Sequence, residues 1–207
     1  MLLKDVFDDN KKFLLLAFAL LIVSLVIVYS LNSGLYSPIN PIPTKKSSYT
    51  EPREFLVEGV DYMITVKTVY GDIDIDLYEQ TAPRNVNSFL FLISERYYEG
   101  LTFHKVIKDF VLQAGDHKGD GTGDPGYIIL KENLNAEFKD YSVGMANASQ
   151  FFIVLPNSDK QLFNGEFTLI GEVISGFAVA DSIAKVETDR DYKPFNDVVI
   201  NSIQITE

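Results

Sequence analysis

Residues 103–116 read FHKVIKDFVLQAGD, and the organisation of the rest of the chain follows from this stretch. Two short apolar runs, Val106-Ile107 and Phe110 to Leu112, lie on either side of the polar pair Lys108-Asp109. Apolar runs of this length next to a polar pair are typical of short strands joined by a turn. The stretch therefore predicts a hairpin-like unit.

Alternation of side chains divides this hairpin into two faces. Lys105, Val111 and Gln113 fall on one face, and the other face carries His104, Val106, Leu112 and Ala114. We expect the second face to be core. The first face is expected to be a surface that combines one cation, one amide and apolar area.

A second extended run, residues 150–155 with the sequence QFFIVL, repeats this arrangement. Its alternation places Gln150, Phe152 and Val154 on one face, and on the other face Phe151, Ile153 and Leu155. Each of the two segments thus places a glutamine beside aromatic or aliphatic side chains.

These motifs, taken in order along the chain, resemble those of the cyclophilins, which are peptidyl-prolyl cis/trans isomerases. The resemblance rests on five stretches: FHKVIKDFVLQAGD, the glycine-rich GDGTG, MANA at 145–148, SQFFIV at 149–154 and LFNGEFTLIGEV at 162–173. It covers roughly residues 58–206. It implies a mainly β fold, a closed eight-stranded antiparallel β-barrel capped by two α-helices, which binds proline-containing polypeptides and needs no cofactor or metal.

The remaining patterns agree with such a barrel. Residues 62–77 predict an antiparallel hairpin in which three aspartates alternate with aliphatic residues. Thr81 and Pro83 predict the start of a helix with an apolar stripe, residues 177–184 predict a second helix, and residues 198–205 predict a closing strand. These patterns alone fit an all-β closed barrel with two helices.

Prolyl isomerisation suits a surface of this composition. The amide barrier is near 20 kcal/mol and no covalent bond is broken. A catalyst has only to favour the twisted amide, in which a donor to the prolyl nitrogen gains strength. We expect Lys105 and Gln113 to be catalytic, and the substrate to contact Phe110, Val111, Ala146, Asn147, Ala148, Gln150, Phe152, Leu162 and Phe167.

Three departures from the cyclophilin pattern concern this surface. Lys105 stands where the family has its catalytic arginine, and a lysine keeps the charge without the planar fork. Leu162 stands at the position of a tryptophan, and Phe167 where a histidine or tyrosine is usual. A second function therefore stays open, a non-catalytic proline-binding or chaperone module that keeps the groove with weakened activity.

Other chemistries find little support in the sequence. The chain has no cysteine and two histidines, and His104 lies on the core face of its strand. The loop GDHKGDGTGDPG at 115–126 lacks the lysine and hydroxyl of a phosphate-binding loop and the glutamate of a calcium loop. The net charge of −11 argues against nucleic acid as a partner, because an acidic protein repels the phosphate backbone.

The N-terminal region predicts attachment to a membrane. Residues 13–31 contain no charged side chain and, as a helix, would be about 28 Å long, enough for a signal-anchor that spans a bilayer. Lys11 and Lys12 precede this segment, so residues 1–12 are expected in the cytoplasm. Cleavage of the segment as a secretory signal is the alternative.

Residues 32–57, rich in proline and serine, predict a linker between the membrane segment and a cyclophilin-like domain at 58–207. The protein is then expected in the cell membrane as a single-pass monomer. Its C-terminal domain would face outside the cytoplasm and assist the folding of exported or surface proteins.

Overall fold

The computed structural model describes residues 46–206. The predicted cytoplasmic segment, the predicted membrane span and the first part of the predicted linker lie outside the described residues. Within 46–206, no helix combines the length and the apolar character that crossing a bilayer requires. The prediction for residues 13–31 therefore stays a prediction.

The described chain folds mainly into strands, and two α-helices and one 3₁₀ helix interrupt them. In order, the elements are β1 (Met63–Thr68), β2 (Gly71–Leu77), α2 (Pro83–Ser94), β3 (Lys105–Ile107), β4 (Val111–Ala114), β5 (Ser142–Met145), β6 (Phe151–Val154), η1 (Lys160–Leu162), β7 (Thr168–Ser175), α3 (Phe177–Ile183) and β8 (Ile200–Thr206).

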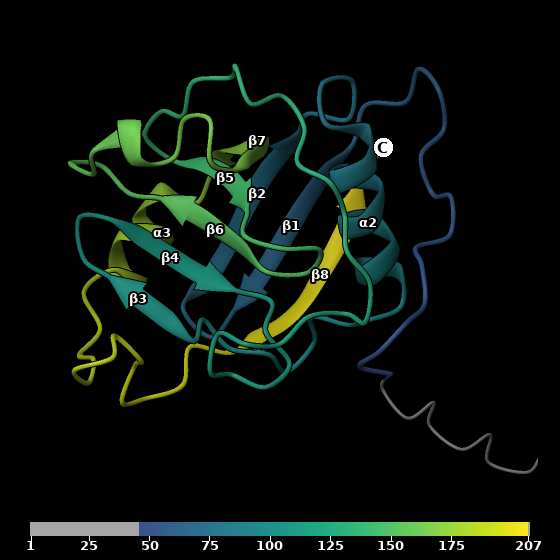
Figure 1. The fold of residues 1–207 in the computed structure, drawn as a ribbon. Helices are drawn as coiled ribbons and strands as arrows, with labels where there is room; N and C mark the ends of the chain where they lie inside the picture. The colour runs from purple at the N-terminus through teal and green to yellow at the C-terminus, as the bar shows by residue number, and fades with distance from the viewer. Residues whose placement is uncertain (1–45, 207) are drawn as a thin grey trace, which may run out of the picture. The chain divides into compact units, whose positions relative to one another are not determined.

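The eight strands form one curled antiparallel sheet in the order β3-β4-β6-β5-β7-β2-β1-β8 (Figure 1). The predicted mainly β, eight-stranded antiparallel architecture with two α-helices is confirmed. The predicted closure of the barrel by a strand ladder is not observed, because in residues 46–206 no ladder pairs β3 with β8. A single bridge between Thr102 and Val199, with a hydrogen bond of 3.0 Å from the amide of Phe103 to the carbonyl of Val198, links the chain before β3 to the chain before β8.

The hairpin predicted at 103–116 is present. Lys105 lies opposite Gln113 and Ile107 opposite Val111. The turn places Asp109 at φ 58°, in the left-handed region that aspartate tolerates better than most residues. The predicted faces are confirmed too, because His104 and Leu112 are buried while Lys105 and Gln113 are half-buried.

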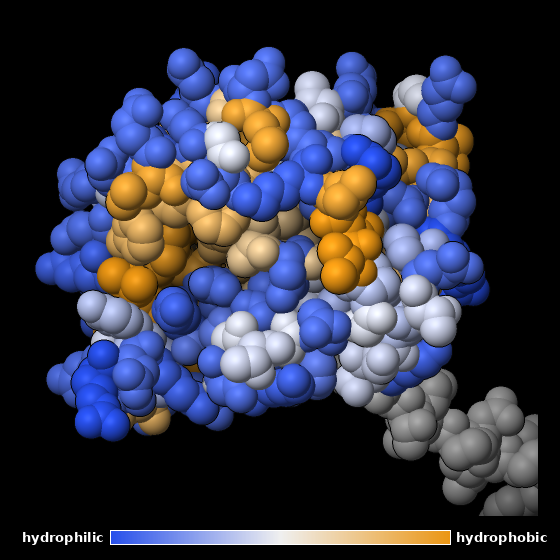
Figure 2. Space-filling view, viewed as in Figure 1, coloured by the Kyte–Doolittle hydropathy of each residue, from blue (hydrophilic) through white to orange (hydrophobic). Residues whose placement is uncertain are grey.

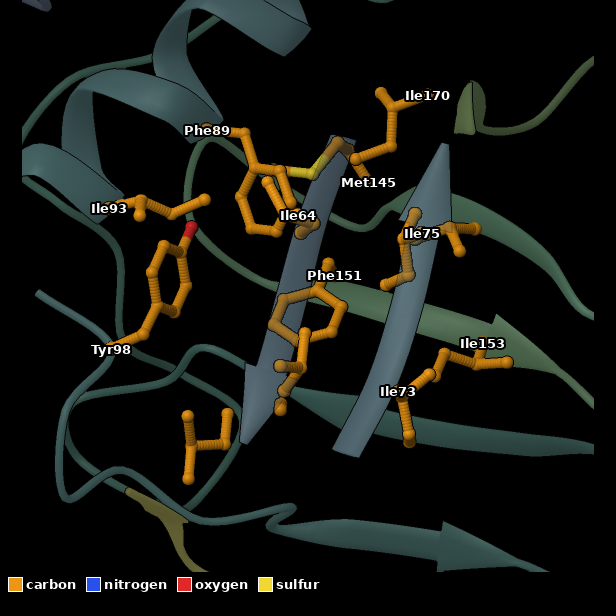
Figure 3. Close-up of a cluster of buried hydrophobic side chains, with 14 of the residues drawn as sticks. Ile64, Ile73, Ile75, Phe89, Ile93, Tyr98, Met145, Phe151, Ile153 and Ile170 are labelled. Carbon is orange, nitrogen blue, oxygen red and sulfur yellow. The ribbon is translucent and has the colours of Figure 1, made fainter. Parts of the chain in front are cut away.

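The main hydrophobic core lies on the inner face of the curled sheet. We call this core the inner cluster; it includes the buried side chains of Ile64, Ile73, Ile75, Phe89, Leu90, Tyr98, Leu112, Phe151 and Ile153. Figure 3 shows Phe89 and Ile93 of α2 pointing toward Phe151 and Tyr98. The rings of Phe89 and Phe151 lie 5.2 Å apart. Helix α2 thus closes the inner cluster.

Helix α2 begins one residue later than predicted. Ala82, not Thr81, occupies the N-cap position, and it provides no side-chain hydrogen bond. The amides of the first turn instead bind Glu132, a residue from a distant loop: its carboxylate accepts from the backbone N–H of Arg84 at 3.3 Å and of Asn85 at 2.8 Å. A carboxylate at this end of a helix is favoured by the helix dipole.

Part of the predicted linker packs on the domain. Tyr49 is buried, donates its amide to the carbonyl of Pro125 at 2.7 Å and meets the ring of Phe91 edge-on. The side chain of Asn87 accepts hydrogen bonds from the amides of Phe55 and Leu56. Residues 49–56 therefore run along helix α2.

Candidate functional site

A second, smaller group of apolar side chains lies on the outer face of the sheet. We call it the outer cluster; its buried members are Val111, Phe138, Phe152, Val154, Phe163 and Leu169. Ile107, Phe110 and Phe167 pack against it and stay partly exposed. Figure 2 shows an apolar band across the face that carries β4 and β6. The outer face is therefore a surface with a hydrophobic floor.

Register aligns the central residues of this surface in one row across five strands. Lys105 of β3 lies opposite Gln113 of β4, which in turn lies opposite Phe152 of β6. Phe152 then pairs with Gly144 of β5, and Gly144 with Leu169 of β7. The cation, the amide and the aromatic floor thus follow one another at the strand spacing of about 4.8 Å.

Phenylalanine rings surround Phe152. Its ring centroid lies 5.1 Å from that of Phe167, 5.5 Å from that of Phe163 and 6.0 Å from that of Phe138. The Phe138 and Phe152 rings are nearly parallel, at 17°, whereas Phe167 stands at 77° to Phe152. Offset and edge-on pairs of this kind are favourable arrangements of aromatic rings.

This ring arrangement requires a glycine on the adjacent strand. A Cβ atom at Gly144 would lie 2.9 Å from Cε1 of Phe138 and would overlap Cζ of Phe152. Any side chain at residue 144 would therefore displace the rings of the outer cluster. Gly144 is part of the site although it contributes no side chain to it.

An amide network borders the row on one side. Gln113 donates from Nε2 to Oε1 of Gln150 at 2.8 Å, and Gln150 donates from its own Nε2 to the carbonyl of Gly123 at 2.7 Å. Gln150 is buried, as an amide can be when its hydrogen bonds are made. The network fixes the Gln113 amide beside the apolar floor and ties the loop at 115–126 to β6.

Asn147 shapes the turn between β5 and β6. Its Oδ1 accepts from the amides of Ser149 at 2.9 Å and of Gln150 at 2.7 Å, and its Nδ2 donates to the carbonyl of Gly123 at 3.0 Å. The neighbouring Ala146 is exposed and Ala148 is buried. The side chain of Asn147 thus holds the rim of the surface, and Ala146 lies exposed on this rim.

The glycine-rich loop is organised around a buried carboxylate. Asp116 accepts hydrogen bonds from the backbone amides of Lys118, Asp120 and Gly121. Burial acts to raise the pKa of the Asp116 carboxyl, but these backbone hydrogen bonds outweigh it and the pKa is lowered. An ionised Asp116 therefore holds this loop beside the amide network.

Lys105 and His104 are adjacent in sequence but face opposite ways. Within residues 46–206, Lys105 makes no ion pair and its side chain no hydrogen bond, so its ammonium is available to a ligand. His104 is buried, and neither ring nitrogen has a hydrogen-bond partner. Burial lowers the pKa of His104; the negative charge of Asp116 opposes this shift, and the positive charge of Lys105 acts in the same direction as burial.

The structure brings most of the predicted site residues together. The residues that lie on or beside the outer cluster are Lys105, Phe110, Val111, Gln113, Gln150, Phe152 and Phe167. Ala146 and Asn147 lie on the rim, whereas Ala148 is buried and its carbonyl accepts a hydrogen bond from Ser88 of α2. Leu162 differs, because it is 56% exposed in η1 and belongs to neither cluster. The next residue, Phe163, packs there instead.

The predicted site did not include Phe138, Gly144, Phe163 or Leu169. Phe163 follows Leu162 directly in an irregular segment. Both residues are apolar, so the sequence does not show which of them points inward. Phe138 lies in a stretch without regular alternation. Gly144 lies in the short strand SVGM, and a glycine inside a strand often marks a place where a neighbouring group approaches the backbone closely. This glycine was the one sequence signal for the crowded rings.

The chemistry that this surface can perform follows from its parts. The apolar floor can hold a compact ring, the amide and backbone groups of the rim can bind peptide groups, and one unpaired cation stands two strands away from Phe152. In residues 46–206 no group of His, Asp and Glu side chains is placed so that it could hold a metal ion. The groups present suit binding and electrostatic stabilisation.

Comparison with known proteins identifies the family. The family model of cyclophilin type peptidyl-prolyl cis-trans isomerase/CLD matches residues 63–205. A peptidyl-prolyl cis-trans isomerase of Arabidopsis thaliana is 33% identical over 154 residues, which cover 69% of this chain and 93% of the plant protein. A putative bifunctional phosphatase/peptidyl-prolyl cis-trans isomerase of Streptococcus pyogenes serotype M6 is 34% identical over 181 residues. That match covers 69% of this chain but 38% of the streptococcal protein.

Solved structures agree with this match. A cyclophilin type peptidyl-prolyl cis-trans isomerase of Cryptosporidium parvum superposes with a TM-score of 0.67 at 30% identity, covering 72% of this chain and 99% of that protein. A second structure of that protein, determined in the presence of the dipeptide Ala-Pro, superposes with a TM-score of 0.65 at 31% identity, covering 70% of this chain and 99% of the other. From the family match, the fold and the row across the outer face, this chain belongs to the cyclophilin-type peptidyl-prolyl cis-trans isomerases.

Proposed function

We propose that this protein catalyses cis/trans isomerisation of X-Pro bonds in polypeptide clients, with Lys105 as the group that donates to the prolyl nitrogen. One observation carries the proposal: an unpaired cation, a fixed amide and an aromatic floor lie in one row across β3, β4 and β6. The relationship to the cyclophilins supports the same reaction.

In the proposed mechanism the proline ring rests on Phe152 beside Phe110 and Phe163. As the amide twists, its resonance is lost and the prolyl nitrogen becomes pyramidal and basic. A hydrogen bond from the Lys105 ammonium to this nitrogen is then stronger in the transition state than in the ground state, which is the condition for catalysis. Gln113, held by Gln150, would bind a carbonyl beside the proline.

The substitution Lys105→Ala tests this role. The rate of isomerisation of a short Ala-Pro peptide can be measured by NMR exchange spectroscopy with the full-length protein in detergent. We expect Lys105→Ala to lower kcat/KM about 100-fold, the usual cost of removing one such donor. Lys108→Ala removes an exposed cation from the turn of the same hairpin and serves as the matched control.

Lys105→Arg separates the two candidate functions. The alternative, a proline-binding module with weakened catalysis, is favoured by the lysine itself, because an ammonium lacks the planar fork of a guanidinium. No acceleration by the parent together with a gain in Lys105→Arg would establish the binding module. Equal activity of Lys105→Ala and the parent would refute the role given to Lys105.

The second part of the proposal concerns location. We propose that residues 13–31 anchor the domain in the cell membrane, with the isomerase domain outside the cytoplasm and acting on exported or surface proteins. The uncharged stretch and the two lysines before it support this orientation.

Because the chain contains no cysteine, single introduced thiols can report this orientation. Ser47 is exposed at the start of the described residues. A membrane-impermeant maleimide should label Ser47→Cys in intact cells. The matched variant Asn10→Cys should be labelled only after permeabilisation, and the reverse pattern would invert the proposed orientation.

A further inference from the structure

The outer face does not end at the aromatic floor. Beyond β7 it is hollowed by a cavity of about 780 Å³ between the end of β2 and the loop near residue 135. Leu169 of the outer cluster lines this cavity, and so do Tyr78 and Ala136, which pack against the outer cluster. The cavity is therefore continuous with the floor on which a proline is proposed to rest.

The wall of the cavity is acidic and contains no cation. Asp61, Asp76 and Glu79 line it, and no lysine, arginine or histidine does. Among residues 46–206, none of these three carboxylates forms an ion pair. Oε2 of Glu79 is buried without a hydrogen-bond partner.

The carboxylates of this region also repel one another electrostatically. Burial raises the pKa of Asp76, and the negative charges of Asp61 and Glu172 raise it further. A buried carboxylate oxygen without a partner, beside carboxylates that repel each other, would be stabilised by a cation that enters with a ligand. A basic side chain of a bound polypeptide brings both a charge and hydrogen-bond donors.

The distance from the floor sets where such a side chain would lie. Phe152 and Leu169 are separated by two strand steps. One step further on, the amide of Tyr78 donates to the carbonyl of Ile170 at 2.8 Å, which places Tyr78 and Glu79 beside this end of β7. The cavity therefore spans about 10 to 14 Å from the proline position. An extended chain advances about 3.3 to 3.6 Å per residue. This range corresponds to three or four residues.

We propose that the cavity is a specificity subsite, which selects client segments that carry lysine or arginine three or four residues from the proline. This inference deepens the proposed function and uses the same outer face. Lys105 lies at the other end of the row, so one end of the surface is positively charged and the end with the cavity is negatively charged. The polarity of the surface would therefore also orient the client.

The test uses peptides with one central Ala-Pro unit and a single lysine at the third or fourth residue, either before or after the proline. Each is compared with the peptide that carries norleucine at that residue, which has a similar chain without the charge. Dissociation constants from fluorescence anisotropy and kcat/KM from NMR exchange are measured with the full-length protein. We expect one side of the proline to show a lysine preference of about threefold to fivefold, as for a partly exposed ion pair.

Two variants should abolish this preference. Asp76→Asn with Glu79→Gln removes two charges from the wall, and Asn135→Lys places a cation of the protein at the cavity, which Asn135 lines. The matched control is Glu187→Gln with Asp197→Asn, which removes two exposed carboxylates outside the cavity wall. The control should keep the preference.

The outcomes separate this inference from the proposed function. A lysine preference in the dissociation constants without isomerisation would sustain the subsite and refute the enzyme. Isomerisation without any lysine preference, or a preference that survives both cavity variants, would overturn the subsite and leave the enzyme intact.

Discussion

The inner and the outer cluster are built from the same strands, and they differ in what covers them. On β6, Phe151 points into the inner cluster and Phe152 into the outer one. The inner cluster is enclosed by the curled sheet and by α2. Within residues 46–206 no helix closes the outer cluster: Phe138 and Phe163 come from irregular segments, and the neighbours Phe110 and Phe167 remain partly exposed.

This difference divides stability and function between two faces of one sheet. In an enclosed cluster every ring contributes to stability, because folding removes its whole apolar surface from water. The partly exposed outer cluster contributes less to the stability of the fold. Its remaining apolar surface can be buried by a ligand. The following predictions test this division, beginning with the largest effect.

The adjacent pair Phe151 and Phe152 offers the sharpest test. Phe151→Ala should lower the free energy of unfolding by about 4 kcal/mol, because the cavity it leaves is enclosed. Phe152→Ala should cost roughly half as much and should abolish measurable binding of an Ala-Pro peptide. Urea unfolding and peptide titration of both variants give the comparison. Equal losses of stability, with binding kept in Phe152→Ala, would show that the two faces do not divide these roles.

Gly144→Ala tests whether the ring arrangement of the outer cluster requires a residue without a side chain at position 144. The added methyl group overlaps Phe152 and approaches Phe138, so the rings must shift. We expect a loss of about 2 kcal/mol in the free energy of unfolding, within the usual range for overpacking, together with weaker peptide binding. Phe138→Leu in the same chain should relieve part of the strain. An unchanged affinity in Gly144→Ala would mean that the ring arrangement does not determine binding.

The smallest predicted effect concerns His104, on the inner face beside Lys105. Its pKa is lowered in the folded chain, mainly by burial. As the pH falls through the unfolded value of about 6.5, the unfolded chain takes up a proton that the folded chain refuses, so this contribution to stability decreases. The full contribution is present above that pH, and the slope for one proton cannot exceed about 1.4 kcal/mol per pH unit.

Unfolding in urea between pH 7.5 and 5.5 measures this slope, and His104→Gln should reduce it. The ring C–H resonances of His104 in the folded protein should titrate at a lower pH than those of an unperturbed histidine, because burial lowers the pKa. A resonance that titrates near 6.5, together with an unchanged slope in the variant, would contradict the account of His104 as a buried neutral residue.

Alternation alone predicted which face of the sheet each strand side chain occupies. In the hairpin of β3 and β4 and in β6, each side chain can reach only one of two faces, and the structure places Lys105, Gln113 and Phe152 on the outer face as expected. Alternation is a local property of the strand backbone, so it can be read without knowledge of the neighbouring strands. The family resemblance added the eight-stranded antiparallel architecture with two helices, whereas the order of the strands came from the structure.

Irregular segments followed no such rule. Phe163, directly after η1, packs into the outer cluster and Leu162 does not, because the path of the chain at a short 3₁₀ helix depends on what it packs against. Glu132 rather than Thr81 binds the first amides of α2, although 48 residues separate Glu132 from Arg84. Contacts between such distant residues cannot be obtained from local pattern.

The sequence by itself determined the hairpin, the two faces of its strands, the family and most residues of the candidate site. The tertiary structure alone decided which rings meet, why residue 144 must be glycine, and that three carboxylates line one cavity beside the aromatic floor. The reason is physical. Alternation sets the direction of a side chain from its own strand, whereas contact and cavity depend on the register between strands that are distant in sequence.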